Sequence, residues 1–169
     1  MDVAVDNTPD TATETLYFDV LIVGAGISGI DAAYHLQKLC PNKSFTILET
    51  QETFGGTWAT HKYPGIRSDS DLFTFGFKWK PWKDDPIATA DKILRYLDES
   101  LDENDLRRHI RFSHQVESAR WSSEEKQWTL SVRNTETGAL ETYACNFLWM
   151  CQGYYRHSEG YMPDYPGME

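Results

Sequence analysis

The stretch GAGISG, from Gly24 to Gly29, constrains the fold of this chain more than any other part of the sequence. It follows a short apolar run, Tyr17 to Val23, of the kind that forms a buried parallel strand. From Ser28 to Cys40, small and apolar residues recur every three or four positions, which predicts a helix with one buried face. Ser44 to Leu48 predicts a second buried strand. A strand, a helix and a strand in this order form a parallel unit with a right-handed crossover.

The glycine spacing GxGxxG in this position is the fingerprint of a dinucleotide site, because Glu49 follows Gly29 by 20 residues, at the end of the second predicted strand. Gly24 would permit the tight turn, Gly26 the approach of a pyrophosphate, and Gly29 close packing of the helix on the strand. The phosphates would face the helix N-terminus. Glu49 would accept hydrogen bonds from ribose hydroxyls and repel a 2′-phosphate, which favours FAD or NAD over NADP. The alternative is a glycine-rich turn followed by an exposed glutamate.

Two further motifs follow within 25 residues of Glu49. The first is GGTW, from Gly55 to Trp58, where two glycines would let the backbone approach a ligand closely. Its alternative is a turn beside a core tryptophan. The second is YPGIRSD, from Tyr63 to Asp69, where a Pro-Gly turn precedes Arg67 and Asp69. A simple surface ion pair between these two side chains is the alternative there.

The remaining sequence divides into one helical and one β-rich part. Residues 53–71 are predicted to be loop, and Pro86 to Arg108 is predicted to be a helix. Alternating apolar residues predict strands over 111–121, 127–133 and 142–150. Phe73, Phe75, Phe77 and Trp79 also alternate; we interpret them as one buried face of an extended segment, the alternative being the wall of a substrate tunnel. The sequence thus predicts an α/β fold, a Rossmann-like domain with a parallel sheet and a β-rich meander.

Composition excludes several classes of function. A formal net charge of −10 argues against nucleic-acid binding and against attraction to anionic membranes. No apolar run approaches the ~18 residues of a membrane span. Residues 1–16 read as a flexible tail, and the first fifteen lack Lys and Arg, unlike a targeting signal. Three cysteines without metal-ligand spacing favour a reduced, cytoplasmic setting, and we expect no metal site among the five histidines.

In order and spacing, GAGISG, Glu49, GGTW and YPGIRSD resemble the N-terminal part of Baeyer–Villiger monooxygenases, within the flavin-containing monooxygenases. Among these, the chain is most similar to the bacterial enzymes that activate the thioamide drug ethionamide. The resemblance runs from Phe18 to the end of the chain and includes HIRFSHQV and FLWMCQGYY. It implies an FAD-binding domain over 17–169, and an enzyme that uses FAD, NADPH and O₂ to oxidise a ketone to an ester or lactone, or a sulfur-containing substrate.

The resemblance also implies roles for individual residues. Arg67 to Asp69 would lie near the nicotinamide, and Asp69, the one catalytic candidate, would orient an arginine from a later part of such an enzyme. FAD contacts are implied at Gly24, Gly26, Ser28, Gly29, Glu49, Gly56, Thr57, Trp58, Ala59, Thr60, Arg67, Ser68, Asp69 and the backbone of Val116.

This sequence departs from the family pattern near its end. We expect the chain to stop before the NADPH-binding half, because the family's F-x-G-x-x-x-H-x-x-x-W fingerprint would begin just after Gly167, and to be inactive alone. Gln152 stands where the family usually has a small residue. Two alternatives stay open: a flavin-containing monooxygenase that attacks only amines or sulfides, and a non-catalytic flavin-binding module.

Overall fold

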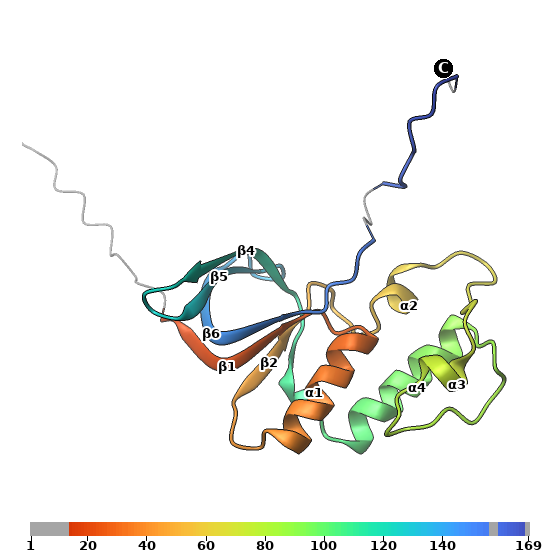
Figure 1. Ribbon diagram of the computed structural model, residues 1–169, viewed down its shortest axis with the longest axis horizontal. Helices are drawn as coiled ribbons and strands as arrows, with labels where there is room; N and C mark the ends of the chain where they lie inside the picture. Colours follow the sequence, from red (N-terminus) through yellow and green to blue (C-terminus); the bar gives the residue numbers. More distant parts are fainter. Residues whose placement is uncertain (1–13, 156–158, 168–169) are drawn as a thin grey trace, which may run out of the picture.

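The computed structural model describes residues 14–155 and 159–167 (Figure 1). Its first three elements are β1 (Leu16–Val23), α1 (Ile27–Leu39) and β2 (Phe45–Leu48), each within one residue of the predicted bounds. The α/β class is confirmed. Residues 1–13 of the predicted tail lie outside the described residues, and Leu16, assigned to that tail, already belongs to β1.

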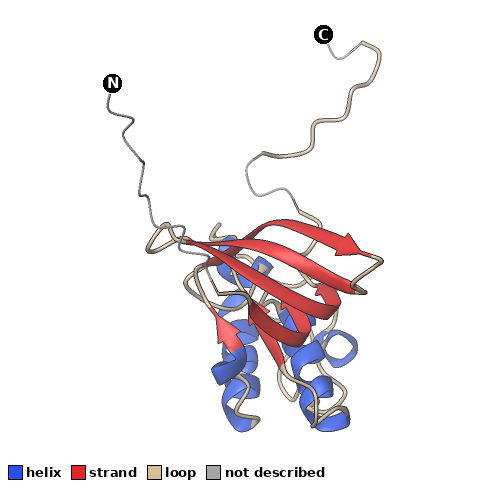
Figure 2. Ribbon diagram, turned by 90° about the vertical axis from the view of Figure 1, so that its left-hand side faces the viewer, coloured by secondary structure: helices blue, strands red, loops and turns tan. Residues whose placement is uncertain are grey.

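All the strands form a single six-stranded sheet in the order β3-β2-β1-β6-β5-β4 (Figure 2). β3 is Ile110–Arg111, β4 is His114–Ser122, β5 is Gln127–Asn134 and β6 is Leu140–Met150. The pairs β3–β2, β2–β1 and β1–β6 are parallel, whereas β6–β5 and β5–β4 are antiparallel. The predicted parallel sheet and the meander are therefore parts of one sheet, joined through β6.

The two edge strands of this sheet are consecutive in the chain, since only Phe112 and Ser113 separate β3 from β4. The sheet must therefore curl so that its two edges approach each other beyond the end of β2. Two backbone hydrogen bonds hold this corner to the segment after β2: His114 N donates to Glu49 O at 2.8 Å, and Ser113 N donates to Gln51 O at 3.0 Å. The curl brings the meander close to the predicted nucleotide site.

Helices α1 and α4 (Ala90–Glu103) lie on one side of the sheet (Figures 1 and 2). Their apolar faces make the larger core with Val20, Ile22 and Ile47 of the sheet. A smaller core occupies the other face, inside the curl. It is formed by Leu21, Leu48, Leu130, Val132, Tyr143 and Cys145.

Two predictions between β2 and β3 are wrong, and the bounds of a third, the long helix, are shifted. The stretch 53–71 contains a one-turn helix, α2 (Thr57–Thr60). The predicted extended aromatic segment contains another, α3 (Leu72–Phe75), which Asp71 caps by accepting a hydrogen bond from Thr74 N at 2.9 Å. The four aromatic side chains do not share one buried face, since Phe73 in α3 is 61% exposed, whereas Phe77, beyond the end of α3, is buried. The long helix begins at Ala90 rather than Pro86, and Arg107–His109 form a separate 3₁₀ turn.

Within the described ranges, no helix is long and apolar enough to cross a membrane, and no group of three or more His, Cys, Asp or Glu side chains could hold a metal ion. All three cysteines are free. Burial raises the pKa of the Cys145 thiol to about 11, which fits an unreactive core thiol.

Candidate functional site

The turn between β1 and α1 requires glycine at two positions. Gly24 has a φ of +101°, and a Cβ there would lie 2.7 Å from the carbonyl oxygen of Cys151. A Cβ on Gly29 would lie 1.9 Å from the carbonyl oxygen of Gly24. Both contacts are with backbone atoms that cannot move aside without moving a strand. Helix α1 therefore packs on β1 as closely as the fingerprint requires.

The N-terminus of α1 presents free backbone donors. Its N-cap is Gly26, which supplies no side-chain cap, and no acidic residue lies in the first turn. The first helical hydrogen bond runs from Ile30 N to Gly26 O, at 3.1 Å. The amides of Ile27, Ser28 and Gly29 thus have no acceptor within the helix. Three amides at the positive end of a 13-residue helix suit the oxygens of a pyrophosphate.

Glu49 is buried, with 8% of its surface exposed, so the alternative of an exposed glutamate after a simple turn is wrong. Its carboxylate connects two segments of the site: Oε2 accepts a hydrogen bond from Ala25 N at 2.7 Å, and Oε1 accepts one from Gln51 N at 2.8 Å. Each carboxylate oxygen keeps a further lone pair, so the group can still accept from ribose hydroxyls.

The GGTW motif lies against the GAGISG turn. Gly55 N donates to Ala25 O at 2.9 Å, and a Cβ on Gly56 would lie 3.1 Å from Gly26 Cα. Gly55 and Gly56 both have positive φ, +117° and +53°. The two motifs, 30 residues apart in sequence, therefore meet backbone to backbone. No side chain separates them at this approach.

The five predicted contact residues that follow, Gly56 to Thr60, are all half-buried. They form α2 and the residue that precedes it. Thr60 Oγ1 donates to Gly56 O at 2.8 Å, and the Trp58 ring meets Phe75 edge to face at 6.2 Å between centroids. Trp58 packs on the border of the larger core without being buried in it. The structure thus places these predicted contact residues on a helical turn, which the sequence analysis did not predict.

Arg67, Ser68 and Asp69 line a hollow of about 630 Å³, together with Tyr63, Gly65 and Ile87. Ser68 is buried and its hydroxyl donates to Ser70 O at 2.7 Å, whereas Arg67 and Asp69 are exposed. Between these two described side chains there is no ion pair, so the surface-pair alternative is wrong. The chain after β6 lies nearby: hydrogen bonding with Tyr154 is the main cause of a raised pKa at Tyr155, and the charge of Asp69 contributes to it.

Val116 lies in the edge strand β4, half-buried against the smaller core. It is two residues beyond His114, whose amide donates to Glu49 O. Backbone groups two residues apart in a strand point to the same side, so the amide of Val116 faces the same side as this hydrogen bond. Val116 thus continues the β4 edge that begins at His114, next to Glu49.

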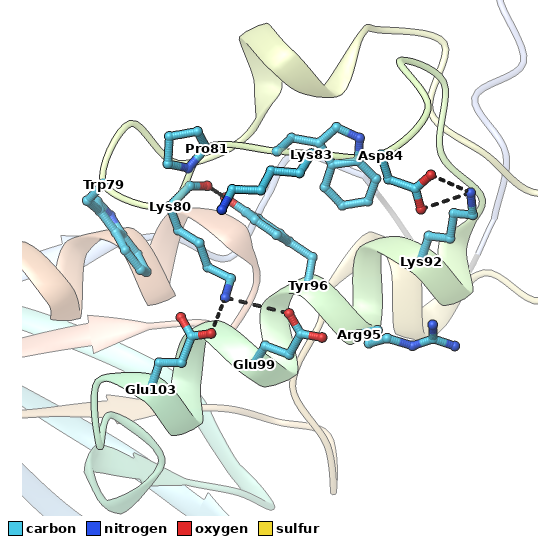
Figure 3. A pocket seen from close by; sticks show the side chains of 11 residues that line it. Trp79, Lys80, Pro81, Lys83, Asp84, Lys92, Arg95, Tyr96, Glu99 and Glu103 are labelled. Atoms are coloured by element: carbon cyan, nitrogen blue, oxygen red, sulfur yellow. Dashed lines mark hydrogen bonds and ion pairs between the residues drawn. The ribbon is translucent and has the colours of Figure 1, made fainter.

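A larger hollow of about 690 Å³ lies elsewhere, between α4 and the loop that precedes it (Figure 3). None of the predicted site residues lines it. Lys80 pairs there with Glu103 at 2.6 Å and Glu99 at 3.6 Å, and Lys92 pairs with Asp84 at 2.9 Å. The lysines of this hollow are thus already paired with neighbouring carboxylates. Although it is larger, we do not take this hollow as the candidate site.

The residues that hold Glu49 in place could not be recognised from the sequence. Ala25 and Gln51 do so through backbone amides, and Arg111 and His114 through backbone hydrogen bonds to the Glu49 main chain. Backbone donors leave no trace in residue type, so spacing cannot reveal them.

Comparison with known proteins agrees with this geometry. Residues 22–86 match the model of an NAD(P)-binding Rossmann-like domain. Over 156 residues, the chain is 49% identical to the FAD-containing monooxygenase EthA of Mycobacterium tuberculosis. The matched region is 92% of this chain and 32% of EthA. It is 48% identical over 152 residues to the probable FAD-binding monooxygenase AlmA of an Acinetobacter species, covering 89% of this chain and 30% of AlmA. Over nearly its whole length, the chain is therefore similar to FAD-containing monooxygenases. It spans about a third of the length of these curated relatives.

Three solved structures share the fold. An oxidised steroid monooxygenase bound to NADP superposes with a TM-score of 0.73 at 28% identity, covering 90% of this chain and 29% of that protein. A closed form of cyclohexanone monooxygenase superposes with a TM-score of 0.72 at 30% identity, covering 92% of this chain and 29% of that protein. OTEMO, in complex with FAD and NADP, superposes with a TM-score of 0.71 at 27% identity, covering 92% of this chain and 29% of that protein. The resemblance to this family in the sequence is confirmed.

Proposed function

We propose that this chain binds FAD in an extended conformation and forms part of a Baeyer–Villiger-type monooxygenase. The single observation that supports this most is the convergence of the free α1 amides, the buried Glu49 carboxylate and the Gly26–Gly56 approach at one end of the sheet. Donors for a pyrophosphate and an acceptor for a ribose lie there side by side, which fits the chemical groups of the adenosine diphosphate half of FAD.

Each group has a distinct task in this proposal. The amides of Ile27, Ser28 and Gly29 hold the pyrophosphate oxygens, and Glu49 accepts from the ribose. The backbone of Val116 lies next to the adenine. Residues Gly56 to Thr60 and the hollow at Arg67, Ser68 and Asp69 lie on the flavin side, where Asp69 would carry a negative charge toward the reacting groups and NADPH.

The reaction we propose for the whole enzyme is oxygenation of a ketone, or of a sulfur compound. Bound FAD supplies the redox chemistry, carrying two electrons from NADPH to O₂. One oxygen atom enters the substrate and the other leaves as water, so that ketone, O₂, NADPH and a proton give ester, water and NADP⁺. The cyclohexanone and steroid monooxygenases among the structural relatives support a ketone as substrate. We also propose that the 169 residues by themselves do not complete this reaction.

The test of FAD binding uses the purified chain. Wild-type protein should bind FAD in a calorimetric titration, and Gly26→Val should bind at least about tenfold more weakly, a loss of about 1.4 kcal/mol, because its methyl groups occupy the pyrophosphate position. Gly160→Val is the matched control, since a Cβ there meets nothing within 4 Å. Equal binding by wild type and Gly26→Val would contradict the proposed site.

A further inference from the structure

Four polar side chains form a connected network inside the curl of the sheet. Arg111 Nη1 donates to Tyr143 Oη at 3.0 Å, and Tyr143 Oη donates to Glu141 Oε2 at 2.9 Å. His114 Nε2 lies 3.5 Å from the same Glu141 oxygen. The residues come from β3, β4 and β6, so this network ties the corner between the two edge strands to the middle of the sheet.

Two members of the network also hold Glu49 through their backbones. Glu49 N donates to Arg111 O at 2.9 Å, and His114 N donates to Glu49 O at 2.8 Å. Arg111 and His114 therefore hold the main chain of Glu49 through its N–H and its C=O, while their side chains reach residues of β6. Any shift of the β3–β4 corner relative to β6 must move Glu49, and with it the carboxylate that accepts from Ala25 N.

Burial of this polar network in the smaller core costs desolvation free energy. Tyr143 is fully buried, and its ring stacks with Phe18 at 6.4 Å in the smaller, otherwise apolar core. Burial, and after it the hydrogen bond to Glu141, raises the pKa of Tyr143 to about 12, while Arg111 opposes this rise. Apolar side chains of similar volume would fill this space at less cost in desolvation. A polar network in a core fixes geometry, because its hydrogen bonds tolerate only a narrow range of positions.

We propose that Arg111 and Tyr143 are positioning residues for the adenosine half of FAD, acting through Glu49. This rests on the proposed function, since it assumes that the ribose lies at Glu49. The network fixes the β3–β4 corner, so that the Glu49 carboxylate and the Val116 backbone stand at a set distance from the amides of α1. A ribose and adenine then bind to groups that are already in place, without the cost of ordering them.

The test measures FAD and ADP binding to the whole 169-residue chain by calorimetry. Tyr143→Phe keeps the ring and removes the hydroxyl that joins Arg111 to Glu141. We expect the dissociation constants of both FAD and ADP to rise about tenfold, because ADP contains only the half of FAD that the network serves. Tyr17→Phe is the matched control, since Tyr17 is half exposed in β1. Removal of its hydroxyl should leave both dissociation constants unchanged.

Other outcomes separate a positioning role from a structural one. If Tyr143→Phe lowers the melting temperature of the ligand-free chain but leaves both constants unchanged, or weakens FAD without weakening ADP, the positioning role is wrong. If Tyr143→Phe fails to fold, Arg111→Lys gives the same test, since it keeps the charge and shortens the donor. Rescue supports the role if Glu141→Gln, which keeps an acceptor oxygen, binds FAD better than Glu141→Leu. Wild-type protein that binds neither ligand would overturn the proposed function itself.

Discussion

The amide of Ala25, inside the glycine-rich turn, donates a 2.7 Å hydrogen bond to the buried carboxylate of Glu49, 24 residues away. The Glu49 carboxylate therefore has a structural task in addition to the proposed contact with a ribose. It holds the end of β2 against the turn that would cradle the pyrophosphate. Stability and ligand binding should consequently fall together when this carboxylate is changed.

Glu49→Gln tests this dual role. Both oxygens of Glu49 accept from backbone amides, of Ala25 and of Gln51. A glutamine side chain offers one oxygen and one NH₂, so one of these two backbone N–H groups must face the NH₂ donor. We expect the free energy of unfolding in urea to fall by about 1–3 kcal/mol, and FAD binding to weaken. Glu52→Gln, at an exposed position nearby, should change neither quantity. An unaltered unfolding midpoint in Glu49→Gln would count against the structural task.

A pair of alanine substitutions separates the two glycines of the fingerprint. A Cβ on Gly29 would lie 1.9 Å from Gly24 O, whereas a Cβ on Gly26 would have its nearest atom, Gly56 Cα, at 3.7 Å, an ordinary contact. Gly29→Ala should therefore lower the free energy of unfolding by at least about 3 kcal/mol, at or beyond the upper end of usual overpacking costs. Gly26→Ala should fold with nearly wild-type stability. Thermal melts of the ligand-free proteins decide, and equal melting temperatures for the two variants would contradict this account.

Stability at high pH should depend on Tyr143. Its pKa is raised to about 12 in the folded chain, from an ordinary value of 10, chiefly by burial. The folded state thus keeps its proton in a range where the unfolded state loses it. This contribution is complete below pH 10 and is lost as the pH rises toward 12, by up to about 3 kcal/mol. In urea titrations at pH 9 and pH 11, wild type should lose more stability than Tyr143→Phe. Parallel losses would show that Tyr143 does not titrate in this way.

The first fifty residues were predictable because their signals are local and repetitive. The apolar runs of β1 and β2 and the three- and four-residue spacing of α1 placed these elements within one residue. The aromatic stretch from Phe73 to Trp79 misled because only Phe73 and Phe75 lie in α3, and a single helical turn is too short to show its period in the sequence. The Asp71 side chain caps this helix by accepting a single hydrogen bond from Thr74 N.

The sequence was informative about which residues gather at the site but not about how they are held. Glycines and Glu49 are visible as residue types, whereas the donors that fix Glu49 are backbone amides. The Arg111–Tyr143 contact joins residues 32 positions apart through the curl of the sheet. Nothing in a single sequence encodes that curl, since it follows from the way β3 and β4 become the two edges.

Asp69 is the residue on which the catalytic proposal depends most, and its environment in the structure allows a sharp test. Its side chain is exposed at a hollow of about 630 Å³ and forms no ion pair with Arg67, which is also described. Its exposure at this hollow is consistent with an orienting role toward an arginine from another part of the enzyme, through a charge-assisted pair.

The test needs a complete enzyme, which a chimera supplies when this chain replaces the matching third of EthA, to which it is 49% identical. In that chimera Asp69→Ala should keep its FAD, because the α1 amides and Glu49 are untouched. Oxygenation should fall by roughly 10²-fold, the scale seen when one preorganised electrostatic group is removed. NADPH consumption should continue with hydrogen peroxide in place of product, since reducing equivalents still reach O₂. Glu124→Ala, in the exposed turn between β4 and β5, is the control and should behave like the parent chimera. The decisive quantity is product formed per NADPH consumed: if this ratio is the same in Asp69→Ala and in the parent, Asp69 has no role in the reaction.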